Sequence, residues 1–193
     1  METVQFLEAD RKSIHHFYQA LMGDGLYFES DEDNQRWEHF LIDWLNGGLK
    51  GYDDLKELFF ETFQPIFQCH QNIYRGMMVE KGTKLLPKRF ASFTTEKSVA
   101  ESFAYYNLEN SNEHDSYFIE MKPERALDLV GLLGCLHEKT GNEDMKVSIE
   151  QWSWECEIIA PLTQEVLNSF SSRTYDAVDV QTKDESSVMD MPF

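Results

Sequence analysis

The order of hydrophobic patterns along the 193 residues predicts an α+β protein. Up to about residue 70, apolar side chains recur at spacings of three and four, which is typical of amphipathic helices. After Asn72 the apolar residues form short runs or alternate with polar ones, which is typical of strands. Because helices come first and strands later, the pattern favours segregated α+β packing over repeated βαβ units.

Three helices are expected in the first part of the chain. They cover residues 4–22, 37–45 and 52–69; glycines follow the first two, and Pro65 bends or restarts the third. Their apolar stripes are interpreted as core. Residues 29–34 are interpreted as a solvated loop that caps the second helix.

Short strands are expected at residues 73–78, 89–95, 117–121, 126–130, 154–160 and 175–180, with one helix at 98–106. Residues 163–170 fit either a helix or a strand. The segment 130–153 exceeds the length of a turn, so it is either a target-recognition insertion or a solvent-exposed elaboration. We expect one domain over residues 1–182, helical over 1–70 and strand-rich over 71–182, and a flexible tail at 183–193.

The charge balance disfavours nucleic acids and membranes as partners. Seventeen Lys and Arg residues against 35 Asp and Glu residues give a formal net charge of −18, which repels phosphate backbones and anionic lipids and favours a basic protein partner. No apolar run approaches the ~20 residues that cross a bilayer, and the first residues lack the features of a secretory signal. The three cysteines have no zinc-ligand spacing. We therefore expect a cytoplasmic protein without a metal.

Polar residues interrupt two of the predicted strands. Arg75 lies in the first, beside Gly76, where burial of a guanidinium requires a fixed anion; an arginine at a sheet edge that reaches water is the alternative. Ser92 and Thr94 flank Phe93 in the second, so both hydroxyls lie on one face. Helix capping and turn chemistry are the alternative roles for these hydroxyls.

Two carboxylates enter a third predicted strand. Glu155 and Glu157 share one face, opposite Trp154, and their mutual repulsion calls for a cation or a function. Trp152 and Trp154 together offer a surface for a flat cation or ring. The alternative is a polar strand edge that faces solvent.

The order of a strand arginine, a Ser-x-Thr segment and a Glu-x-Glu segment resembles the arginine–serine–glutamate class of mono-ADP-ribosyltransferases. This class includes binary actin-modifying toxins, cholera-like enzymes, ecto-transferases and phage enzymes, and the resemblance covers about residues 50–180. It implies a mixed or antiparallel two-sheet core behind the N-terminal helices, and NAD as the ADP-ribose donor. A Rossmann-type glycine motif is absent from the sequence.

The resemblance also implies roles for single residues. Glu157 would be the catalytic group that favours positive charge at the anomeric carbon of the ribose, and Ser92 would orient it. Arg75 would bind the NAD diphosphate, and the backbone of Gly76 would receive the nicotinamide amide. Thr94 would support the strand.

The resemblance makes Glu155 the residue that selects the acceptor. A glutamate two positions before the catalytic one accompanies arginine acceptors, whose guanidinium needs a nearby base before it attacks. Trp154 or Trp152 would hold that guanidinium by stacking. Phe93, with Phe90 as the alternative, would either stack on nicotinamide or fill the core.

Three functional hypotheses follow. The first is an NAD-dependent protein-arginine ADP-ribosyltransferase, a glycosyltransferase of phage or bacterial effector type that modifies a protein in the cytoplasm of a host cell. The second is an NAD glycohydrolase with the same fold, in which water is the acceptor. The third is a non-catalytic acidic protein that covers a basic surface.

Overall fold

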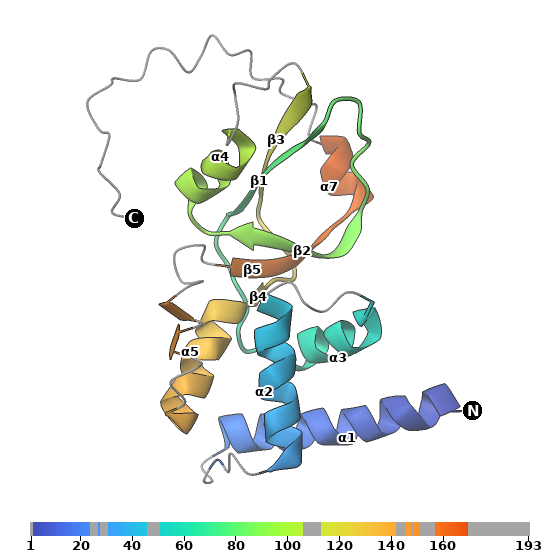
Figure 1. Ribbon diagram of the computed structural model, residues 1–193, viewed down its shortest axis with the longest axis vertical. Coiled ribbons are helices and arrows are strands. Elements are labelled where there is room, and N and C mark those ends of the chain that lie inside the picture. The colour runs from blue at the N-terminus through green and yellow to red at the C-terminus, as the bar shows by residue number, and fades with distance from the viewer. Residues whose placement is uncertain are drawn as a thin grey trace.

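The computed structural model describes residues 2–23, 27, 31–45, 51–105, 113–141, 146–147, 149–150 and 157–169, with side chains from residue 8 onward. It confirms the α+β class (Figure 1). The main elements in chain order are α1 (Glu2–Met22), α2 (Glu32–Leu45), α3 (Asp53–Phe63), β1 (Ile73–Glu80), β2 (Lys88–Thr94), α4 (Lys97–Tyr105), β3 (His114–Met121), β4 (Leu127–Asp128), α5 (Leu129–Thr140), β5 (Glu157–Leu162) and α7 (Gln164–Ser169).

The first three helices and α5 pack together beside the β4 and β5 edge of the sheet (Figure 1). The predicted apolar stripes meet there: Phe17, Trp37, Leu41, Phe59 and Phe63 are completely buried. Aromatic rings contact one another edge-on or tilted through this layer, as between Phe17 and Phe63, whose centroids are 5.7 Å apart. The interpretation of the stripes as core is confirmed.

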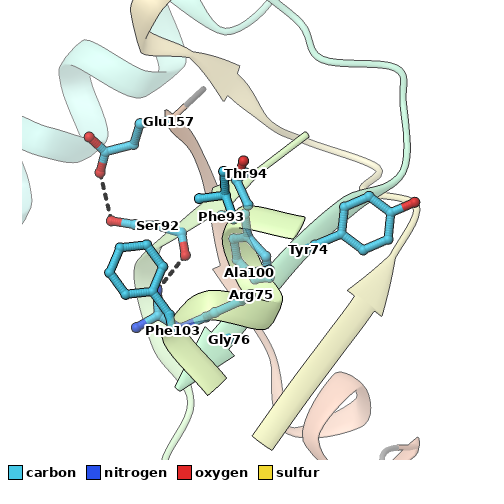
Figure 2. Close-up of a pocket in the computed structure, with 10 residues that line it drawn as sticks. Tyr74, Arg75, Gly76, Ser92, Phe93, Thr94, Ala100, Phe103 and Glu157 are labelled. Atoms are coloured by element: carbon cyan, nitrogen blue, oxygen red, sulfur yellow. Dashed lines mark hydrogen bonds between the residues drawn. The ribbon is translucent and has the colours of Figure 1, made fainter. Parts of the chain in front are cut away.

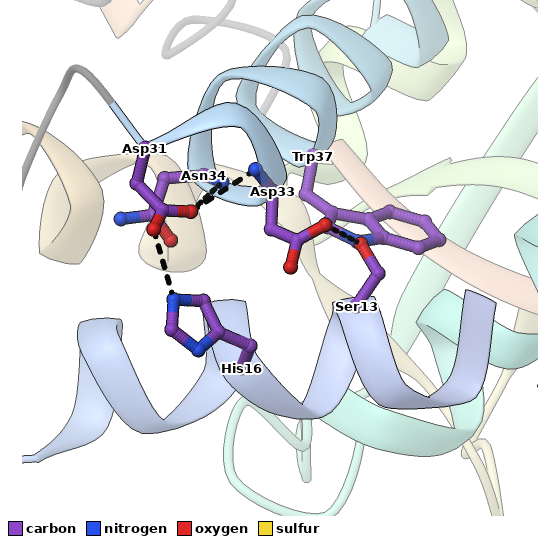
Figure 3. Close-up of polar contacts among 6 residues, drawn as sticks. All are labelled: Ser13, His16, Asp31, Asp33, Asn34 and Trp37. Carbon is purple, nitrogen blue, oxygen red and sulfur yellow. Dashed lines mark hydrogen bonds and ion pairs between the residues drawn. The ribbon is translucent and has the colours of Figure 1, made fainter. Parts of the chain in front are cut away.

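A polar seam joins α1 to the start of α2 (Figure 3). The indole N–H of Trp37 donates to the hydroxyl of Ser13 (2.9 Å), and that hydroxyl donates to Asp33 (2.5 Å). One turn further along α1, His16 Nε2 lies 3.1 Å from Asp31 Oδ2. Asp31 also accepts the backbone N–H of Asp33 at 3.0 Å, as an N-cap residue does. The expected cap in residues 29–34 is therefore present at Asp31.

All strand pairs are antiparallel, in the order β3-β1-β2-β5-β4. The eight residues of β1 pair in continuous register with β3, whereas β1 pairs with β2 at a single position, Tyr74 with Thr94. A two-sheet core was expected, but the described strands form one sheet whose two parts are joined at this single pair. Beyond it, β1 and β2 diverge.

Helices cover both faces of this sheet. Helix α4 contacts β1, β3 and β2, and α7 packs Val166 and Leu167 against a second cluster of buried residues that includes Ile73, Phe93 and Ile119. The segment 163–170, which fitted helix or strand, is thus helical over residues 164–169.

The segment after β4 differs most from expectation. A strand to residue 130 was expected, with residues 130–153 as either a target-recognition insertion or a solvent-exposed elaboration, but β4 is two residues long and α5 follows at once. Asp128 accepts the N–H of Gly131 at 2.8 Å and caps the helix. Leu129, Leu132, Leu133 and Leu136 are buried against the helical layer. Within residues 130–153, α5 therefore contributes to the core through its leucines.

Other expectations concern residues outside the described ranges. These are the strand at 175–180, the tail at 183–193 and the first three residues of the strand expected at 154–160. Within the described part of the chain, no helix combines the length and the apolar character needed to cross a membrane.

Candidate active site

A pocket of about 280 Å³ opens where β1 and β2 diverge, beside α4 and the start of β5 (Figure 2). This volume is at the lower end of the range for small-molecule sites. Its lining consists of Tyr74, Arg75, Gly76, Ser92, Phe93, Thr94, Val99, Ala100, Phe103 and Glu157. Residues of all three interrupted strands, predicted from separate parts of the sequence, therefore meet in one cavity.

Strand register brings Ser92 to Glu157. Ser92 pairs with Ile159 of β5, and Glu157 is two residues before Ile159, so the two side chains lie on the same face in diagonal positions. The Ser92 hydroxyl donates to Glu157 Oε1 at 2.7 Å. Glu157 is only 8% exposed, and β5 lies between β2 and β4. The alternative of a solvent-facing strand edge is therefore wrong for Glu157.

Arg75 extends from β1 towards β2 and donates through Nη1 to the backbone carbonyl of Ser92 (Figure 2). Strand β1 lies between β3 and β2 in the sheet order, but it pairs with β2 only at Tyr74. At Arg75 the β2 side of β1 is therefore unpaired, and the side chain is partly exposed, which agrees with the alternative of an arginine that reaches water beside an open strand edge. Arg75 Nε is buried, with no hydrogen-bond partner among the described residues. Burial lowers the pKa of the guanidinium, and the charge of Glu157 counteracts this. Arg75 as a whole is half-buried, and a partly desolvated cation with an unused buried donor favours an anionic or strongly polar ligand.

The backbone of Gly76 faces the opening between the strands. The Lys81 N–H donates to the Glu113 carbonyl at 2.8 Å, and the backbone groups of an antiparallel strand point alternately to its two sides. Every second residue before Lys81, namely 79, 77 and 75, therefore directs its backbone N–H and carbonyl towards β3. The residues between them, including Tyr74 and Gly76, direct their backbone N–H and carbonyl towards β2. Since β1 pairs with β2 at Tyr74 alone, the Gly76 N–H and carbonyl point into the divergence.

Two predicted residues also have structural contacts. The Thr94 hydroxyl accepts the backbone N–H of Glu96 at 2.9 Å, which is a local turn contact just before α4 rather than a cap of that helix. Phe93 is 3% exposed and packs in the second buried cluster. The exposed ring at the pocket is Phe103 of α4, which is 43% exposed. Phe103 was not among the residues predicted from the sequence, although its position on one face of the predicted helix was a signal.

Glu155, Trp154 and Trp152 lie outside the described residues. The acceptor-selecting role of Glu155 and the stacking roles of the tryptophans therefore stay predictions. Glu157 is the first described residue of β5, which places the three residues shortly before the carboxylate in the chain.

A second cavity, of about 510 Å³, is lined by Gln68, Cys69, Asp128 and Ile158, among others. Burial raises the pKa of the Cys69 thiol, and the nearby charge of Asp128 acts in the same direction. The thiol is thus held in its protonated, poorly nucleophilic form. Among the described residues that line this cavity there is no arginine, and the Asp128 carboxylate caps α5.

One group of potential metal ligands occurs among the described residues, in the helical layer. A ligand atom each from His16, Asp31 and Asp33 lies within 4.8 Å of the others. These residues hydrogen-bond within the seam between α1 and α2 (Figure 3). They line neither of the two cavities, so the candidate active site does not include them.

Comparisons with protein-family models, with curated proteins and with solved structures found no match to this chain.

Proposed function

We propose that this protein is an NAD-dependent mono-ADP-ribosyltransferase that acts on a protein, with arginine as the acceptor side chain. The observation that carries the proposal is the hydrogen bond between Ser92 and Glu157 in the same pocket as the partly buried guanidinium of Arg75. A carboxylate held beside a partly desolvated cation suits a substrate that carries phosphate groups and develops positive charge at another atom.

The chemistry divides between these residues. The bond between nicotinamide and the ribose anomeric carbon breaks, nicotinamide leaves with the bonding electrons, and the ribose becomes an oxocarbenium-like cation. The Glu157 carboxylate stabilises that charge and accepts a hydrogen bond from the ribose 2′-hydroxyl. The acceptor nitrogen then bonds to the anomeric carbon and releases its proton to solvent or to a nearby base. Arg75 neutralises the phosphates that remain on the ADP-ribosyl group.

The size and lining of the pocket support the proposal. A cavity of about 280 Å³ suits the nicotinamide-ribose end of NAD rather than the whole dinucleotide. The exposed ring of Phe103 offers a stacking surface for nicotinamide, and the inward-facing backbone of Gly76 offers a donor and an acceptor to its amide.

Arginine as the acceptor follows from Glu155 in the sequence. A second carboxylate two residues before Glu157 would position the acceptor guanidinium and take up its proton. A basic, arginine-bearing target in a cytoplasm also complements the net charge of −18.

The test incubates the protein with NAD labelled in its adenylate part and with a cell lysate. Transfer to arginine attaches label to protein, and hydroxylamine releases it. Glu157→Gln should reduce labelling by at least about 100-fold, whereas Glu80→Gln, a matched change at the exposed end of β1, should not affect it. Free labelled ADP-ribose without labelled protein would indicate that the protein hydrolyses NAD and does not transfer ADP-ribose to arginine. Equal NAD turnover by the protein and Glu157→Gln would overturn the enzymatic proposal and favour a non-catalytic acidic protein.

A further inference from the structure

Gly76 allows an unusually close contact between a strand and a helix. A Cβ at this position would lie 1.6 Å from the backbone oxygen of Ala100 and 2.7 Å from the nitrogen of Ala104. Both distances are far shorter than the ~3.5 Å of an ordinary contact between heavy atoms. Ala100 and Ala104 are themselves completely buried. Three small residues thus let the backbone of α4 lie directly against β1.

The same helix forms one wall of the candidate active site. Val99, Ala100 and Phe103 line the pocket from α4, while the charged groups of Arg75 and Glu157 line it from the strands. Because α4 packs on β1 through Gly76, the separation between helix and strand also sets the separation between the Phe103 ring and the strand groups (Figure 2).

We propose that Gly76, Ala100 and Ala104 are positioning residues that set the width of a slot for a flat aromatic amide. The inference rests on the proposed function, in which the nicotinamide ring of NAD, rather than its ADP-ribose part, lies against Phe103 in this pocket. A methyl group on Gly76 would displace α4 by roughly 2 Å before an ordinary contact is restored. That displacement moves the Phe103 ring of α4 out of van der Waals distance, and a ring that stacks in the slot then loses its contact on that face.

The test separates the two parts of the substrate. Nicotinamide and ADP-ribose, neither of which is consumed, are titrated by calorimetry into the protein and into Gly76→Ala and Ala104→Val. We expect both variants to weaken nicotinamide binding about tenfold and to change ADP-ribose binding by less than about twofold. Gly134→Ala is the matched control, since a Cβ on Gly134 has no atom within 4 Å, and it should leave both affinities unchanged.

Hydrogen exchange in the absence of ligand gives an independent readout. Displacement of α4 should increase amide exchange over residues 97–105 in Gly76→Ala and, to a smaller extent, in Ala104→Val, whose added methyl groups also crowd the interface. If the amides of α4 exchange as slowly in the variants as in the unchanged protein, the proposed slot is overturned. Equal weakening of nicotinamide and ADP-ribose would also overturn it, because it would indicate general destabilisation.

These results distinguish the slot from the proposed function. If the protein binds both ligands and the variants do not separate them, the slot fails and the proposed function stands. If the unchanged protein binds neither nicotinamide nor ADP-ribose, both fail.

Discussion

Ser92 connects the two charged residues of the site through two different groups. Its backbone carbonyl accepts from Arg75, and its hydroxyl donates to Glu157. The carbonyl depends only on the position of the chain, whereas the hydroxyl depends on the side chain. A substitution at Ser92 can therefore release Glu157 while it leaves the anchor of Arg75 in place.

Ser92→Ala should lower kcat for NAD cleavage by up to about 100-fold, because a carboxylate misplaced by ~1 Å loses much of its stabilising effect. The KM for NAD should change little, since Arg75 retains its partner. Ser92→Thr keeps the hydroxyl and should restore most of kcat. Steady-state kinetics on the three proteins provides the measurement; an alanine variant with unchanged kcat would show that Ser92 does not orient Glu157.

Among the elements, α5 differs most from the sequence-based expectation, because it packs in the core. Its four buried leucines face the helical layer, so truncation of one of them creates a cavity. An exposed elaboration would instead tolerate such changes. The stability of variants in α5 thus tests its place in the core.

Leu133→Ala should decrease the free energy of unfolding by about 2–5 kcal/mol, because the Leu133 side chain is completely buried. Leu86→Ala is the control: Leu86 is 66% exposed, so its loss should change stability by about 0.5 kcal/mol or less. Urea unfolding followed by circular dichroism measures both. A similar, small effect of the two substitutions would contradict the core position of α5.

The start of α2 predicts a pH dependence. Desolvation raises the pKa of Asp31, but hydrogen bonds from the Asn34 N–H and from His16 outweigh it, so the pKa is lowered below its ordinary value. A carboxylate with a lowered folded-state pKa stabilises the fold above its unfolded-state pKa of about 4, and this stabilisation is lost as pH falls through the folded-state value.

Asp31→Ala should reduce the free energy of unfolding at pH 6 by about 1 kcal/mol, because it removes the N-cap. Asp31→Asn retains a capping side chain and should cost less. Both differences from the unchanged protein should shrink on acidification below pH ~4, as Asp31 becomes protonated. Denaturant titrations from pH 6 to pH 3 are the measurement, and differences that grow on acidification would refute the assignment.

At the scale of the whole molecule, net charge and local charge act in opposite directions on the proposed substrate. The chain carries −18 and NAD is an anion, so long-range electrostatics slow their encounter. Arg75 attracts the substrate only at short range within the pocket, where salt screens less.

The association rate of NAD should therefore rise as ionic strength increases from about 0.01 M to about 0.1 M, since the Debye length falls from about 30 Å to about 10 Å. Uncharged nicotinamide is the control and should show no such dependence. Stopped-flow fluorescence measures both rates. A rate that decreases with added salt would indicate that positive charge around the pocket dominates the encounter.

The sequence by itself determined the local features of this protein. Periodicity located the first three helices, β1, β2 and α4, because each has a regular apolar face. It also located Arg75, Ser92 and Glu157 as polar interruptions of apolar strands. The helix α5 was missed because its leucine-rich stretch follows directly on a strand. The periodicity of a short apolar run does not distinguish a buried strand from a buried helix.

Tertiary structure alone decided how these residues meet. Ser92 and Glu157 are 65 residues apart in the chain, and only strand register makes them diagonal neighbours. The exposure of Phe103 and the burial of Phe93 depend on which helix covers which face. The need for glycine at position 76 arises from the backbone of α4. Local sequence specifies conformation and polarity, whereas contacts between distant segments come from packing of the whole chain.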